Sequence, residues 1–278
     1  MLRHTFLHVP GVGQITERRL WAQGLLSWKD CLCHVETRPL SGYIRGTLAP
    51  YLEASVKALE GRDARYFEER LPPAEMWRAY PEFGDRVAFV DIETTGLYHG
   101  TDVITVIGLF DGKSTKVFIR GINLEEFPLE LKKYSLLVTF NGKRFDLPFL
   151  RRTFGELPDH IADIDLYYVL KKLGYRGGLK SIERQLGLER EGALQGVDGF
   201  LAVLLWREYE RGNQAALHTL VRYNLEDVVN MQYLADIAYN QALVTLPIPV
   251  QPLPVRAKYT VATPFDPDLI RYLKRFTG

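Results

Sequence analysis

The stretch from Val87 to Gly96 constrains the fold more than any other part of the sequence. It begins as an apolar run of the kind that forms a buried strand, and it then continues into Asp91 and Glu93. Because side chains alternate across a strand, these two acids point to the same face. Two carboxylates on one face resist burial unless a positive charge lies between them, and Mg²⁺ or Mn²⁺ suits carboxylate oxygens. The alternative is a strand end that carries two acids on a solvated edge.

The composition is that of an ordinary globular protein. The chain has 278 residues, of which 46% are hydrophobic and 25% charged, so its length fits one large domain or two smaller ones. The formal net charge of +1 means that any binding of nucleic acid has to come from local patches. The N-terminus has no apolar signal core, and no apolar run approaches the length of a membrane span. We therefore expect a cytoplasmic protein.

The two cysteines, Cys31 and Cys33, argue for a reducing compartment and against a disulfide framework. They lie beside His34 in a segment with a helical pattern, where residues two apart do not face each other. No second Cys/His pair stands at zinc spacing. We therefore favour a buried, apolar cysteine over a metal site.

Residues 1–35 contain a Pro-Gly-x-Gly turn, Val9–Gly13, followed by the pattern of an amphipathic helix. This arrangement resembles one helix-hairpin-helix unit, with residues 24–30 as its second half. In that motif the turn presents backbone N–H groups to a phosphate at a helix start. The alternative is a turn that joins two packing helices. Helical patterns follow at residues 51–59 and 64–71.

The pattern changes from helices to strands near residue 86. The strand-like runs are residues 87–94, 103–110, 116–119, 135–140 and 163–166, and helical patterns lie at residues 124–133, 167–173, 179–187, 200–211 and 215–234. The first three strands follow one another, which predicts an antiparallel meander. We predict an α/β fold with a mixed five-stranded sheet flanked by helices over residues 86–240. A helical region in residues 1–80 precedes it, and an extended tail with a C-terminal helix occupies residues 241–278.

A further acid stands where the fourth strand meets a helix. Asn141 and Gly142 break the strand, and Pro148 is tolerated in the first turn of a new helix. Asp146 therefore lies at a strand-to-helix corner. The alternative is a simple helix cap, since Asp is a preferred capping residue.

The last acid of interest lies on the inward face of the helix predicted at residues 215–234. Asp227 faces inward there, and Tyr223 lies one turn before it on the same face. A buried Asp needs a partner, and a hydrogen bond from Tyr223 would satisfy it without any catalysis. The whole inward stripe reads Leu220, Tyr223, Asn224, Asp227, Met231 and Leu234.

Four acids thus occur along the chain, in the order Asp91, Glu93, Asp146 and Asp227. With their flanking residues they resemble the DEDD exonucleases of the ribonuclease H-like superfamily. DIETTG looks like the first motif of that family, and YNLED looks like the third. NGKRFDLPFL looks like the second motif and is similar to its version in the proofreading domains of family B DNA polymerases. The resemblance spans residues 86–240.

The tyrosine four residues before the last aspartate, Tyr223, is the mark of the DEDDy form. The DEDDh form would place a histidine five residues before it, where this chain has Arg222. The closest likeness is to the YprB-like ribonuclease H-like proteins, which carry a helix-hairpin-helix-like segment ahead of this domain.

The resemblance implies a metal-dependent reaction. Two Mg²⁺ or Mn²⁺ ions would lie about 4 Å apart on the scissile phosphate. Asp91 would bridge both ions, Glu93 and Asp227 would complete one site, and Asp146 would hold the other largely through water. Tyr223 would orient the attacking water, because an unperturbed phenol is too weak an acid to serve as its base near pH 7.

The resemblance also implies substrate contacts and an activity. Thr94, Thr95, Asn141 and Phe145 are expected to contact the terminal nucleotide. Lys180 stands where some family members use a lysine on a phosphate, although a solvated lysine is an equal alternative. We expect a 3′–5′ exonuclease acting on nucleic acid, with single-stranded DNA favoured over RNA. The alternatives are an endonuclease or ribonuclease of the same fold, and a nucleic-acid-binding module that does not cleave.

Overall fold

The sheet that the sequence predicts is present in the computed structural model, which describes residues 1–276 except 39, 99, 189, 191, 193, 195, 196, 255, 257 and 258. Its strands are β1 (Val87–Thr94), β2 (Ile104–Phe110), β3 (Thr115–Ile119), β4 (Leu136–Thr139) and β5 (Ala162–Asp165), in the order β3-β2-β1-β4-β5. The first three strands pair antiparallel. The pairs β1–β4 and β4–β5 are parallel, so the sheet is mixed. The predicted α/β fold is confirmed.

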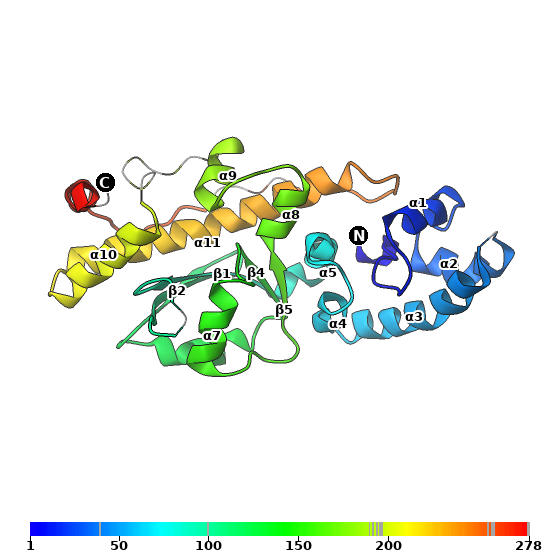
Figure 1. The fold of residues 1–278 in the computed structure, drawn as a ribbon, viewed down its shortest axis with the longest axis horizontal. Helices are drawn as coiled ribbons and strands as arrows, with labels where there is room; N and C mark the ends of the chain where they lie inside the picture. Colours follow the sequence, from blue (N-terminus) through cyan, green and yellow to red (C-terminus); the bar gives the residue numbers. More distant parts are fainter. Residues whose placement is uncertain are drawn as a thin grey trace.

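Alternation along β1 sorts its side chains between two hydrophobic clusters. Val87 and Phe89 join the larger cluster, which contains the apolar side of the long helix α11 (Gln214–Leu243). Ala88, Val90 and Ile92 join the smaller one with residues of α7 (Asp146–Phe154). Helices therefore cover both faces of the sheet, as Figure 1 shows with α7 below it and α11 above it. Asp91 and Glu93 continue the series that faces α11.

The remaining helices of this part of the chain lie close to their predicted positions. They are α6 (Phe127–Leu131), α8 (Leu166–Lys172), α9 (Leu179–Gln185) and α10 (Gly199–Glu210), with α12 (Pro267–Leu273) near the C-terminus. The helix α11 extends to Leu243, well past the predicted end at residue 234. It continues because inward positions such as Ala238 and Ala242 remain apolar and buried, and the first proline after them is Pro247.

The N-terminal region is helical, as predicted, but its longest helix was underestimated. It contains α1 (Gln14–Ala22), α2 (Trp28–His34), α3 (Gly42–Glu60), α4 (Ala64–Glu68), the 3₁₀ helix η3 (Pro73–Ala79) and α5 (Tyr80–Phe83). The helix α3 begins at Gly42 rather than near residue 51, because Ser41 caps it by accepting a hydrogen bond from the Ile44 N–H at 3.3 Å. Cys31 is buried as predicted, whereas Cys33 is exposed, so the expectation fails for the second cysteine.

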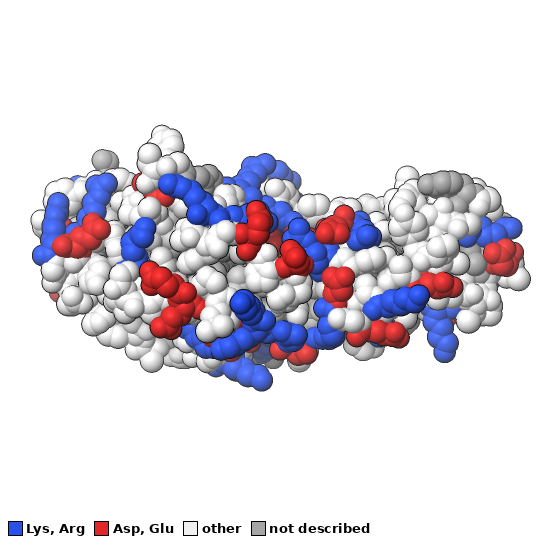
Figure 2. Space-filling model, turned by 90° about the horizontal axis from the view of Figure 1, so that it is seen from below, with Lys and Arg blue, Asp and Glu red and all other residues white. Residues whose placement is uncertain are grey.

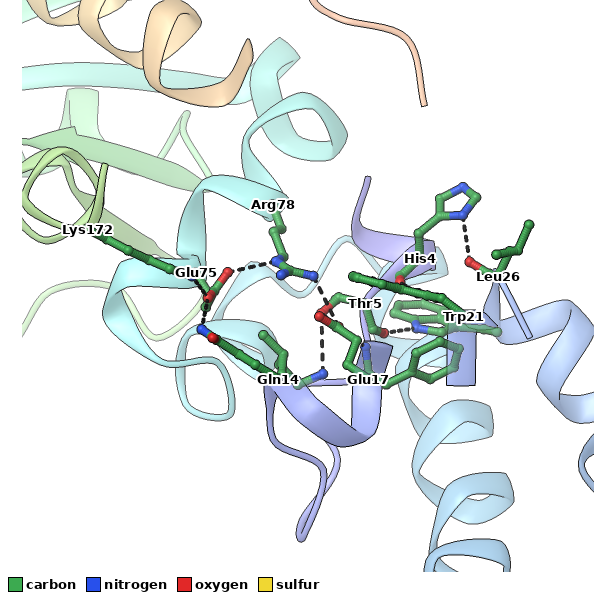
Figure 3. A network of polar contacts seen from close by, with 12 residues as sticks. His4, Thr5, Gln14, Glu17, Trp21, Leu26, Glu75, Arg78 and Lys172 are labelled. Carbon is green, nitrogen blue, oxygen red and sulfur yellow. Dashed lines mark hydrogen bonds and ion pairs between the residues drawn. The ribbon is translucent and has the colours of Figure 1, made fainter. Parts of the chain in front are cut away.

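Buried charges join this helical region to the sheet domain (Figure 3). The Arg78 guanidinium of η3 lies between Glu17 of α1, at 3.1 Å, and Glu75, at 2.9 Å. Lys172 of α8 pairs with the same Glu75, which also accepts a hydrogen bond from Gln14 at 3.0 Å. Apolar residues of α1 and α2 belong to the same hydrophobic cluster as those of α11. The N-terminal helices therefore pack as part of one continuous core.

Candidate active site

Three carboxylates meet where β1 passes beneath α11. Asp91 and Glu93 come from β1, and Asp227 comes from α11. One carboxylate oxygen from each lies within 4.8 Å of the other two. Glu93 and Asp227 are buried, and Asp91 is partly buried. A solvated strand edge, the alternative considered from the sequence, does not describe this environment.

Asp146 lines the same cavity as these three carboxylates but comes from α7. It is the first residue of α7, and its side chain does not cap that helix, whose N-cap is Phe145. Its Oδ1 instead accepts a hydrogen bond from the backbone N–H of Ile92 at 3.2 Å. The carboxylate thus points at β1, where Ile92 lies between Asp91 and Glu93 in the sequence. It lies outside the three-residue group defined by the 4.8 Å limit.

Asp165 holds the turn that delivers Asp146. This residue ends β5, and its carboxylate accepts hydrogen bonds from the backbone N–H groups of Asn141 at 2.7 Å, Lys143 at 3.2 Å and Tyr167 at 3.0 Å. Asn141 has the left-handed φ of 61°, which Asn tolerates better than most residues. The sequence analysis read Asp165 only as part of a short strand. Its role depends on a strand pairing that no local pattern reveals.

Asn224 is a second residue whose contribution the sequence analysis did not identify. Its Nδ2 donates to Asp91 Oδ2 at 2.9 Å and to Glu93 Oε1 at 3.4 Å. Gly108 of β2 makes room for it, since a Cβ at position 108 would lie 2.0 Å from Asn224 Oδ1. The sequence signal that could have identified Asn224 was its position on the inward stripe of the helix, one turn before Asp227. The amide holds two carboxylates side by side without adding charge.

Two basic side chains neutralise Asp227. Lys180 of α9 and Arg190 both form ion pairs with its Oδ1. Arg190 is buried and is fixed by two hydrogen bonds to Glu183, at 2.8 and 2.6 Å. The Lys180 side chain is only 23% exposed, so the alternative of a solvated lysine is wrong. Arg190 was missed because the sequence places it in an irregular stretch after α9.

The electrostatics of the four acids follow from burial and mutual repulsion. Burial first, and then Asp227 and the neighbouring acids, raise the pKa of Asp91 well above its ordinary value and that of Glu93 to about 8. Burial likewise raises the pKa of Asp146 to about 7. Burial also opposes ionisation of Asp227, but Arg190 and Lys180 hold the pKa of that carboxyl below its usual range. Among the described residues no basic side chain forms an ion pair with Asp91, Glu93 or Asp146. Divalent cations fit this all-oxygen donor set.

Tyr223 lies beside the acids with its proton retained. Its ring is buried, and the Lys180 ammonium lies 4.5 Å from the ring centroid. Burial, followed by the nearby Asp227 and Glu93, raises the pKa of the phenol well above its ordinary value. Within the described ranges no hydrogen bond joins Tyr223 to Asp227, so the structural alternative considered from the sequence is not seen. The hydroxyl is a hydrogen-bond donor at neutral pH rather than a base.

The four acids and Tyr223 line one cavity of about 820 Å³. The predicted substrate contacts Thr94, Thr95, Asn141, Phe145 and Lys180 line it as well. The two threonine hydroxyls are already engaged, because Thr94 donates to the Gly96 carbonyl at 2.5 Å and Thr95 donates to Asp102 at 3.0 Å. They shape the turn after β1 and present its backbone to the cavity.

The comparison with family models bears directly on this geometry. Residues 88–239, more than half of the chain, match the model described as the RNase_H superfamily. The chain belongs to the RNase_H superfamily. Membership in it, with the acidic cluster at the cavity floor, supports a nuclease that hydrolyses nucleic acid with divalent metal ions. None of the described helices is long and apolar enough to cross a membrane.

The solved structures to which this chain is similar include two kinds of protein. The family B DNA polymerase from the archaeon Pyrobaculum calidifontis is 19% identical with a TM-score of 0.43, over 57% of this chain and 24% of its own. Brucella melitensis NrnC is 22% identical with a TM-score of 0.42, over 60% of this chain and 78% of its own. The structure of Brucella melitensis NrnC bound to pGG is 20% identical with a TM-score of 0.39, over 58% of this chain and 74% of its own. This chain spans about a quarter of the length of the polymerase. The search of the curated proteins returned no match.

Proposed function

We propose that the protein is a 3′–5′ exonuclease of the DEDDy type that uses two Mg²⁺ or Mn²⁺ ions. The observation that carries the proposal is the meeting of Asp91, Glu93 and Asp227 within 4.8 Å at the floor of an open cavity, with Asp146 directed at the same strand. Such a set of oxygen donors on a rigid strand and helix is suited to metal-assisted hydrolysis of a phosphodiester. The YprB-like group of these enzymes remains our assignment from the sequence motifs.

The four acids Asp91, Glu93, Asp146 and Asp227 would hold the ions. When bound, the ions supply an activated water and neutralise charge on the leaving 3′ oxygen. Asn224 keeps the two β1 carboxylates in register through its hydrogen bonds. The Tyr223 hydroxyl, which keeps its proton, would orient the attacking water by donating or accepting a hydrogen bond.

The preference for single-stranded DNA and the role of the N-terminal turn are further parts of the proposal. Val9–Gly13 precedes α1, and the Val9 and Val12 N–H groups donate within the turn, so the N–H groups of Gly11 and Gly13 would receive a phosphate of the substrate. We assign assistance in substrate binding to residues 1–35, and cleavage with the contacts to the terminal nucleotide to residues 86–240. Figure 2 shows basic and acidic side chains alternating along one face of the molecule, which favours recognition by local groups over a broad basic surface.

A time course on end-labelled nucleic acids tests the function. Single-stranded DNA, duplex DNA and RNA are incubated with Mg²⁺, Mn²⁺ or EDTA, and the products are resolved by length. A ladder that shortens from the 3′ end, requires metal and is fastest on single-stranded DNA is the expected result. Internal cuts would make the protein an endonuclease, and a faster reaction on RNA would make it a ribonuclease. Gel shifts without cleavage would leave a binding module. Asp91→Asn, which removes one of the proposed metal ligands, is the inactive control.

A further inference from the structure

The helix α10 forms one wall of the catalytic cavity, and the four acids lie on other elements. Three of its side chains line the cavity: Phe200, Val203 and Arg207. Their spacing of three and four residues places them on one face of the helix. In Figure 1, α10 lies beside the first turns of α11, the helix that carries Asp227. The face therefore extends the cavity away from the reacting centre along a rigid element.

Phe200 exposes a large apolar ring to this cavity. Its exposed fraction is 53%, although burying a Phe side chain stabilises a protein. Among the described residues no aromatic ring pairs with it. Two neighbours on the same helix, Leu201 and Leu205, are fully packed. The exposed ring thus stands apart from the core and offers a flat apolar surface to a ligand.

Arg207 provides a positive charge on the same face of α10. Lys180 and Arg207 are the two basic residues among those that line the cavity, and Lys180 is paired with Asp227. In the part of the chain that the structure describes, the Arg207 side chain forms no ion pair or hydrogen bond. Arg211, one turn later, is instead paired with Glu208 at 2.6 Å. A guanidinium without an acidic partner at the edge of a cavity is suited to a phosphate group.

We propose that α10 binds the nucleic-acid strand beyond the reacting nucleotide, with a base stacked on Phe200 and a phosphate held by Arg207. Seven residues of helix separate the two side chains, which is about 10 Å along the axis. The contacts are therefore made with more than one nucleotide. Stacking and a phosphate contact are both tolerant of sequence, so the wall selects for strand length rather than for a particular base. This inference rests on the proposed nuclease function.

A comparison of two substrates distinguishes binding by α10 from the reaction at the acidic cluster. The first is the p-nitrophenyl ester of thymidine 5′-monophosphate, a phosphodiester with one nucleotide. The second is a single-stranded oligonucleotide of eight residues. We expect Phe200→Ala and Arg207→Ala to hydrolyse the small ester as the wild type does. On the oligonucleotide, loss of stacking should raise KM about 5- to 150-fold, the range expected for one stacked base. Compared with Phe200→Ala, Phe200→Trp should restore most of the affinity for the oligonucleotide, and Phe200→Leu should not.

The salt dependence of binding isolates the phosphate contact. Arg207→Ala should lower the slope of log affinity against log salt by about 0.7, the value for one phosphate contact on a single strand. Arg211→Ala, a matched loss of charge on the same helix, and Phe276→Ala, a matched loss of an exposed ring, should leave KM and slope unchanged. Equal KM values for wild type and both α10 variants on the oligonucleotide would overturn the inference while leaving the nuclease function intact. A wild type that hydrolyses neither substrate would instead overturn the function itself.

Discussion

At the scale of single residues, the site is controlled by how polar groups are held next to one another. Asn224 donates hydrogen bonds to both Asp91 and Glu93, and Arg190 with Lys180 neutralises Asp227. The negative charge of Asp227 is therefore already balanced by basic side chains, whereas the charges of Asp91 and Glu93 are not. This asymmetry favours uptake of cations on the β1 side of the cluster.

Tyr223→Phe tests the role of the phenol. The substitution keeps the packing of the ring and removes one hydrogen bond to the water, so metal binding should be preserved. We expect kcat to fall by roughly ten- to a thousand-fold without a change in fold. Steady-state kinetics and a Mn²⁺ titration measure the two properties. A variant that cleaves as fast as the wild type would show that Tyr223 only packs beside Asp227.

Gly108→Ala tests whether the Asn224 side chain needs the space that Gly108 leaves above β2. The new Cβ would lie 2.0 Å from Asn224 Oδ1, so Asn224 must shift away from the two carboxylates. We expect a loss of about 1–3 kcal/mol in the free energy of unfolding, with weaker Mn²⁺ binding. The double variant Gly108→Ala/Asn224→Ala should recover part of the stability, because the clash is removed. Gly46→Ala, with open space around its Cβ, is the control that should not destabilise the protein. Equal losses in the single and double variants would refute the clash.

At the scale of elements, the N-terminal helices and the sheet domain are joined by the Glu17–Arg78–Glu75 contacts. Removing residues 1–35 would delete Glu17 and the buried Trp21 and Trp28. A truncation would therefore damage the core as well as any binding site in the turn. Point substitutions separate these two effects.

Arg78→Ala should be strongly destabilising. It leaves Glu17 without its cationic partner inside the core, and breaking such a buried pair costs about 3–5 kcal/mol. Arg271→Ala, which breaks an exposed pair with Asp268, should cost less than about 1 kcal/mol. Urea denaturation of both variants measures the difference. Equal midpoints would mean that the buried network contributes little to the docking of these helices.

Gly13→Asp tests the proposed phosphate site at the start of α1. Gly13 is the N-cap of α1, and nothing lies within 4 Å of a Cβ built there. An aspartate should cap the helix and maintain stability, while its carboxylate takes the place of a substrate phosphate. We expect a higher KM for long single strands with kcat unchanged at saturating substrate. Gly13→Ala is the neutral control, and a Gly13→Asp variant with wild-type KM would remove the turn from the binding surface.

At the scale of the whole molecule, stability depends on pH through the acidic cluster. Glu93, with a pKa of about 8, and Asp146, with a pKa of about 7, bind protons more tightly in the folded than in the unfolded chain. The stability that they contribute is present below the ordinary carboxyl pKa and is lost as the pH rises through 7 and 8. His8 has its pKa lowered to about 3 and acts in the opposite direction only below about pH 6.5.

The melting temperature in EDTA should therefore fall between pH 6.5 and pH 8.5, by about 2–4 °C for each kcal/mol lost. Mn²⁺ should stabilise the protein more at pH 8.5 than at pH 6.5, because cations bind the ionised carboxylates. Glu93→Gln/Asp146→Asn should flatten the profile in EDTA. Thermal denaturation across this range measures all three effects. A profile that rises with pH in EDTA would contradict the assigned direction of these pKa shifts.

The sequence by itself determined the sheet and the faces on which the acids lie. Alternation along residues 87–94 places Asp91 and Glu93 together, and helical spacing places Asp227 on the inward face of α11. The turn at Asn141 and Gly142 marks the corner where Asp146 begins its helix. These are local properties, because the backbone period of a strand or helix fixes the direction of each side chain.

The tertiary structure alone decided which groups meet the acids. Arg190 reaches Asp227, Asn224 fits over Gly108, and Asp165 holds the turn before Asp146. Each of these contacts joins segments that are distant in sequence or separated by irregular chain. Their geometry depends on strand pairing and helix docking, and so do burial and the pKa values that follow from it. No local periodicity carries that information, since a buried charge is recognised by its partners rather than by its neighbours in the chain.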